Sequence, residues 1–210
     1  MRFLLPLLVV ALMVSGASAQ NPTGGPHDMR AFLGIDEVCV PCHTPHHSNP
    51  AHPDGLWNHA LPSATFTMYD QNFVDGVVAA VPNTASMICL SCHDGVTGVD
   101  SYGGWAQGGT TGTQNFPAGD NRNIGTNLGD DHPISIEYAY MTYHGGHGLV
   151  DPAGLLGHSS PAMVFPGGTY AGGEPYYTVE CGSCHHVHAT NDDLLSTDNT
   201  GSALCLACHQ

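Results

Sequence analysis

The sequence predicts a chain that is mostly loop, with short helices at four cysteine-containing motifs and one minor β-hairpin. Glycine and proline, which interrupt helices and strands, supply 27 and 15 of the 210 residues. The pattern Cys-x-x-Cys-His recurs four times along the chain. A glycine-rich stretch between two β-type runs is the third observation, because such a stretch predicts a hairpin.

All eight cysteines belong to the four motifs, which span residues 39–43, 89–93, 181–185 and 205–209 and are numbered motifs 1 to 4. Cysteines at i and i+3 lie on one side of a helical turn, where both thiols can add to the vinyl groups of one haem. The histidine that follows then binds the iron. The pattern predicts four covalently bound haem c groups, held by Cys39, Cys42, Cys89, Cys92, Cys181, Cys184, Cys205 and Cys208, with His43, His93, His185 and His209 as iron ligands.

Zinc clusters and disulfide frameworks are the alternative explanations for paired cysteines. Neither requires a histidine directly after each pair. With 15 histidines in 210 positions, four chance matches have a probability of about a few in a hundred thousand. The histidines therefore favour haem. Each haem then has about fifty residues to cover it, so the haems are expected to form most of the hydrophobic core of one domain.

Short helices are expected to run into motifs 2 and 4. Residues 85–88 and 199–204 directly precede these motifs, and a polar residue suited to capping a helix lies ahead of each run. The helical turn that each motif itself requires would extend these segments.

The long segment between motifs 2 and 3 contains the predicted β structure. Residues 134–140 alternate in the strand period, and residues 162–165 and 176–179 are β-type runs around the glycine-rich residues 167–173. Residues 100–129 are rich in Gly, Thr and Asn and are expected to form an exposed loop.

The N-terminus has the features of a secretory signal peptide. An arginine follows Met1, residues 3–14 are apolar, and Ala17-Ser18-Ala19 supplies small residues for cleavage. The apolar run is too short for a membrane anchor. The sequence predicts a signal peptide over residues 1–19 and a single exported tetrahaem domain over residues 20–210, with no membrane span.

The chain is acidic and has few charges of either sign. The sequence has no lysine, three arginines and 18 Asp and Glu, and charged residues make up 10% of it. Nucleic acid requires a basic surface and is excluded as a partner. A surface poor in charge favours a secreted, self-associating protein, although adaptation to an acidic or unusual milieu would also explain it.

Eleven histidines lie outside the motifs, and this surplus predicts that each iron is bound by two histidines. His46 and His188 each come three residues after a motif histidine, a spacing suited to reaching a neighbouring haem. His132 lies between Asp131, which could orient its ring, and Pro133. The remaining non-motif histidines are His27, His47, His52, His59, His144, His147, His158 and His186.

Several segments resemble the exported c3-like cytochromes with doubled CxxCH motifs. They are residues 26–28, motif 1 continuing through Thr44-Pro45-His46, residues 56–59, residues 89–95, residues 131–135 and motif 4. The chain is especially similar to tetrahaem members that polymerise into extracellular filaments. The resemblance implies bis-histidine haems in a closely stacked line, with one haem bound by a histidine of the next subunit. It implies His27, His46, His132 and His188 as the four distal ligands, with His59 as a fifth candidate and His186 as an alternative to His188.

The expected function is electron transfer along the four haems, in a homopolymer at the cell surface or outside the cell. Motifs close to both ends of the expected mature chain would let subunits pass electrons end to end, and His46 or His27 would be the donor across the joint. Redox proteins or extracellular acceptors are the expected partners. A monomeric periplasmic shuttle is the alternative, and an oxyanion reductase is a third reading. An enzyme of that kind needs an open iron and cationic groups, and this chain is poor in cations, so we expect no enzyme.

Overall fold

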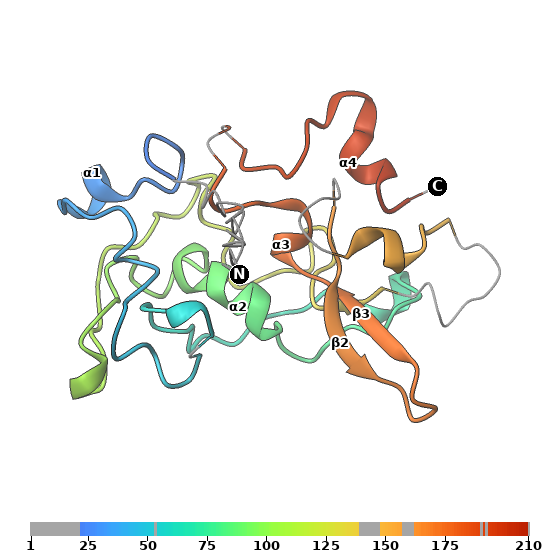
Figure 1. The fold of residues 1–210 in the computed structure, drawn as a ribbon, viewed down its shortest axis with the longest axis horizontal. Coiled ribbons are helices and arrows are strands. Elements are labelled where there is room, and N and C mark those ends of the chain that lie inside the picture. The colour runs from blue at the N-terminus through green and yellow to red at the C-terminus, as the bar shows by residue number, and fades with distance from the viewer. Residues whose placement is uncertain are drawn as a thin grey trace, which may run out of the picture.

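A computed structural model describes residues 22–52, 54–138, 148–156, 162–189, 191 and 193–209. The expected signal peptide lies outside the described residues. The described chain contains short helices and one small antiparallel sheet, and the rest is irregular, which confirms the predicted loop-rich fold (Figure 1). The elements are α1 (Arg30–Leu33), η1 (Asp54–Leu56), η2 (Gln71–Phe73), α2 (Thr84–His93), η3 (Trp105–Gln107), β1 (Ile136–Glu137), η4 (Pro152–Leu155), β2 (Phe165–Thr169), β3 (Pro175–Val179), α3 (Cys181–Cys184), η5 (Thr200–Ser202) and α4 (Ala203–Leu206).

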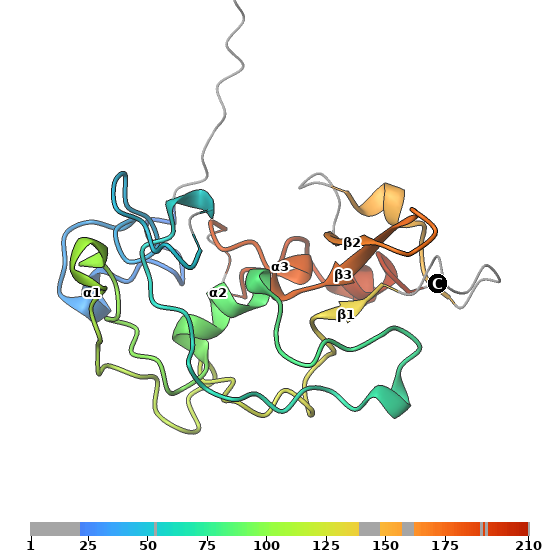
Figure 2. The same ribbon diagram turned by 90° about the horizontal axis from the view of Figure 1, so that it is seen from below.

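Helix α2 lies in the middle of the molecule, between α1 on one side and the sheet on the other (Figure 2). It starts after Asn83 and runs through motif 2 to His93, as the sequence predicts. The helix buries Leu90, which packs with Phe66 and Leu128 in an apolar cluster. A short helix also leads into motif 4, where η5 continues directly into α4.

Shortening Leu90 is expected to destabilise the fold. Its side chain is completely buried, so Leu90→Ala should lower the free energy of unfolding by about 2–5 kcal/mol, through lost apolar burial and the cavity left behind. Leu206 occupies the same position in motif 4 and is 58% exposed, which makes Leu206→Ala the matched control. Denaturant unfolding of the mature protein measures both, and equal losses would contradict the assigned core.

The sheet has the order β1-β3-β2, and both pairs are antiparallel. The predicted hairpin is confirmed, with β2 and β3 joined through the glycine-rich turn. Of the predicted β-type run 162–165, only Phe165 belongs to strand β2. Ala162 and Val164 are buried, but they lie before the strand. The predicted strand over 134–140 is shorter than expected, because Ser135 has a φ of 52° that breaks the extended backbone before β1. Residues 139 and 140 lie outside the described part.

Residues 100–129 are irregular apart from η3, but the expectation that they form an exposed loop is wrong in part. Phe116 and Leu128 are only 4% and 3% exposed. Phe116 contacts the ring of His93, and Leu128 joins the cluster around Leu90. A composition rich in glycine and threonine does not reveal that two apolar side chains anchor the segment against motif 2.

Within the described residues, no helix has the length and apolar character needed to cross a membrane.

Candidate haem sites

Each of the four motifs forms a helical turn. The backbone N–H of the motif histidine donates to the carbonyl of the first cysteine at 2.8 Å for His43, 3.1 Å for His185 and 2.8 Å for His209, and motif 2 ends helix α2. None of the eight cysteines forms a disulfide. Both thiols of every motif therefore come from one turn, as thioether bonds to a single haem require.

Three motif histidines are oriented by backbone carbonyls. Nδ1 lies 2.6 Å from the Gly55 carbonyl in His43, 2.6 Å from the Arg122 carbonyl in His93 and 3.0 Å from the Asp193 carbonyl in His185. A carbonyl can only accept, so Nδ1 carries the hydrogen and Nε2 keeps its lone pair. This is the tautomer that iron ligation through Nε2 requires. The residues present fit a haem in this respect.

Three motif histidines also face a second imidazole from a distant segment. The ring centres are 6.1 Å apart for His27 and His93, 6.2 Å for His43 and His188, and 6.5 Å for His132 and His209. An imidazole nitrogen binds a metal at about 2.0 Å, so two rings on opposite sides of one iron have centres about 6.3 Å apart. All three pairs have the separation that one shared iron would impose.

Burial keeps several of these rings neutral. It lowers the pKa of His27 and of His93, and it lowers the pKa of His188, which also lies near His43. Only the neutral ring can bind a metal. Their partly buried positions therefore favour the protonation state that ligation needs.

The other candidates differ in their surroundings. His188, not His186, is the imidazole opposite His43. His59 is buried, with Nδ1 2.9 Å from the Ala60 carbonyl and Nε2 3.2 Å from the Val99 carbonyl. Nε2 also lies 3.6 Å from Cys92 Sγ, and within the described residues no second imidazole faces the ring of His59.

Within the described ranges, His46 and His185 form no such imidazole pair. His46 is exposed on the segment after motif 1. His185 has the carbonyl contact of a motif histidine, but no imidazole of the described residues lies opposite it. His144, His147 and His158 lie outside the described residues. The structure therefore brings together three of the four pairs that the histidine count predicts.

Thiols of consecutive motifs lie side by side. Burial and the nearby Cys42 together raise the pKa of Cys92 to about 12. The neighbouring Cys181 and burial raise the pKa of Cys89. Burial raises the pKa of Cys184, and the nearby Cys205 raises it further. The four motifs thus follow one another in space in the order 1-2-3-4, and the sequence offers no signal for this order.

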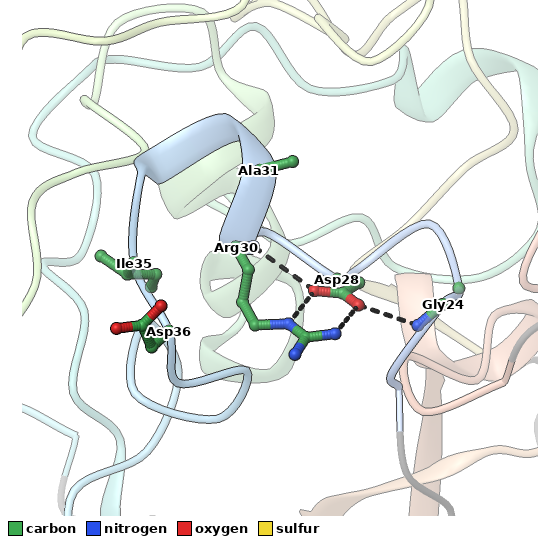
Figure 3. A pocket seen from close by; sticks show the side chains of 7 residues that line it. Gly24, Asp28, Arg30, Ala31, Ile35 and Asp36 are labelled. Carbon is green, nitrogen blue, oxygen red and sulfur yellow. Dashed lines mark hydrogen bonds and ion pairs between the residues drawn. The ribbon is translucent and has the colours of Figure 1, made fainter.

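Two arginine-centred turns hold the residues around motif 2. Asp28 directly follows His27 in the sequence. It accepts hydrogen bonds from the Arg30 guanidinium at 2.8 and 2.7 Å and from the Gly24 N–H (Figure 3). Arg122 pairs with Asp120 at 2.6 Å, which lowers the pKa of that carboxyl to about 2, and its guanidinium lies 4.4 Å from the centre of the Phe116 ring. Sequence reasoning missed this role for Phe116.

Comparison with known proteins supports the assignment of the motifs. The family model described as "Doubled CXXCH motif" matches residues 174–210, which contain motifs 3 and 4. The comparison with curated proteins gives no match to this chain. The matched segment carries a multihaem c-type cytochrome-like motif, which indicates a haem-binding electron-transfer cytochrome with covalently bound haem c.

Proposed function

We propose that this chain is an exported tetrahaem c-type cytochrome that carries electrons along four bis-histidine haems. The observation that carries the proposal is the set of three imidazole pairs with ring centres 6.1, 6.2 and 6.5 Å apart, each containing one motif histidine. Bound haem supplies an iron that takes up and releases one electron.

The chain's own residues hold the haems and orient the ligands. His43 and His188 flank the first site, His27 and His93 the second, and His132 and His209 the fourth. The Gly55, Arg122 and Asp193 carbonyls hold the Nδ1 hydrogens of three motif histidines, which leaves each Nε2 free to bind. Adjacent thiols in consecutive motifs keep the sites close, and short gaps favour electron transfer between them.

The same arrangement argues against an enzyme. A histidine on each side of an iron leaves no position for a substrate. Arg30 and Arg122 are the arginines of the described chain, and each is paired with an aspartate. An oxyanion reductase needs an open iron and free cationic groups to hold the anion, and neither is available at these three sites.

We infer that the protein assembles into an extracellular filament through His46. His27 is already paired with His93 inside the chain, so His46 is the remaining candidate donor across a subunit boundary. Its exposed ring, three residues after His43, could reach the iron of a neighbouring subunit whose motif 3 histidine, His185, has no imidazole partner in the described residues. Head-to-tail contacts of this kind do not close on themselves and produce fibres.

Haem count and spin state test the electron-transfer proposal. We expect the mass of the mature protein to correspond to residues 20–210 plus four haems. Electron paramagnetic resonance of the oxidised native protein should show low-spin signals from all four irons. A substantial high-spin signal at neutral pH would instead support an iron with an open position and an enzymatic role.

A further inference from the structure

Glu180 is a buried carboxylate at the start of helix α3 that electron transfer alone does not explain. The residue is 1% exposed and directly precedes Cys181. Its side chain accepts from Asn83 Nδ2 at 2.8 Å, from Ser86 Oγ at 2.5 Å and from Ser135 Oγ at 2.9 Å. It also accepts from the backbone N–H of Ser183 in a capping box.

The groups around the Glu180 side chain are hydrogen-bond donors, as a carboxylate requires. Ser86 Oγ accepts the Cys181 N–H at 3.2 Å, and Ser135 Oγ accepts the Asn83 N–H at 2.8 Å. Each hydroxyl keeps one hydrogen of its own, which it can donate to Glu180. With the Asn83 amide and the Ser183 N–H, four donors surround the two carboxylate oxygens, and donors in this number stabilise the charged form of a carboxyl group.

This charge has no cationic partner in the part of the chain that the structure describes. The two ion pairs there join Arg30 to Asp28 and Arg122 to Asp120. An ionised carboxylate away from water is costly unless it is fully hydrogen-bonded. Its four donors meet that requirement, and they leave its negative charge uncompensated.

The hydrogen bonds of Glu180 connect motif 2 with motif 3, the two central motifs in the order 1-2-3-4. Ser86 lies on α2 one turn before Cys89, while Glu180 and Cys181 begin α3, and the two helices lie side by side in both views (Figures 1 and 2). The Cys89 and Cys181 thiols are close enough for each to shift the pKa of the other. Glu180 therefore holds motifs 2 and 3 in contact while adding one negative charge between them.

We propose that Glu180 is a positioning residue that sets the contact between the haems of motifs 2 and 3, and a fixed negative charge that lowers the reduction potentials of these two haems. The proposal rests on the proposed tetrahaem function. Reduction adds an electron to a site that already faces an uncompensated anion, and charges interact strongly in a buried environment. Burial and nearby charge are established means by which a protein tunes a haem. The middle of the electron path would then lie at lower potential than its ends.

Spectroelectrochemical titration of the exported, fully matured protein tests this role. Glu180→Gln removes the charge and keeps the shape, so the equilibrium constant for reduction should rise about tenfold for the two central haems. Glu180→Asp keeps the charge on a shorter side chain and should lower thermal stability while leaving the potentials near those of the native protein. Glu174→Gln removes an exposed charge at the tip of the hairpin and is the matched control.

Each outcome separates this role from the proposed function. Four covalent haems with unmoved potentials in Glu180→Gln would overturn the charge role, even if stability fell. A native haem count other than four would instead contradict the tetrahaem proposal. If Glu180→Gln does not mature, Ser135→Ala replaces it, since removing one donor leaves the charge less screened and should shift the same potentials downward. An upward shift, or none, would overturn the proposal.

Discussion

Replacing His188 with alanine is expected to convert one of the four haems from low-spin and six-coordinate to high-spin and five-coordinate. The ring of His188 lies opposite His43 with a centre separation of 6.2 Å, so its loss opens one face of the first iron. The covalent haem count should stay at four, because both thioether bonds and His43 remain. Absorption and electron paramagnetic resonance spectra of the oxidised protein should show about one quarter of the haem as high-spin.

His186 provides the matched control, since it lies two residues away and its ring faces His188 rather than His43. His186→Ala should leave the low-spin spectrum intact. His27→Ala and His132→Ala should each repeat the effect of His188→Ala at the second and fourth sites. If His188→Ala keeps all four irons low-spin while His186→Ala opens one, the ligand at the first site is His186.

Replacing His46 with alanine is expected to abolish filaments and to leave one high-spin haem in each released subunit. His46 is exposed and belongs to none of the three imidazole pairs of the described residues. If its ring closes the iron of the next subunit, the joint is a coordination bond, and salt, which screens only surface charge, should not dissolve the native polymer. Negative-stain imaging and the spin state of the same preparation measure both effects.

The adjacent residue supplies the control for this prediction. His47 is also exposed, and His47→Ala should still form filaments with every iron low-spin. Native protein that stays monomeric at high concentration, with all four irons six-coordinate, would contradict the filament. In that case His144, His147 or His158 would supply the fourth distal ligand within the chain, and the protein would be a periplasmic shuttle.

The haem-attachment residues could be read from the sequence because each motif is local. Two cysteines and a histidine within five residues need one helical turn, and every motif forms one. A polar residue ahead of residues 85–88 and the glycine-rich residues before β3 are likewise local signals, for the start of α2 and for the hairpin. The exported state, the number of haems and the filament are predictions from sequence that the experiments above would test.

Tertiary structure alone decided which residues meet across long stretches of chain. The pairing of His43 with His188, the order of the four motifs and the burial of Phe116 all depend on contacts between segments that no local pattern links. Glu180 is the clearest case, since its donors come from residues 83, 86, 135 and 183. In the sequence it is one acid among 18 Asp and Glu. Only folding removes it from water, because burial and hydrogen bonding are properties of the packed chain rather than of the residue.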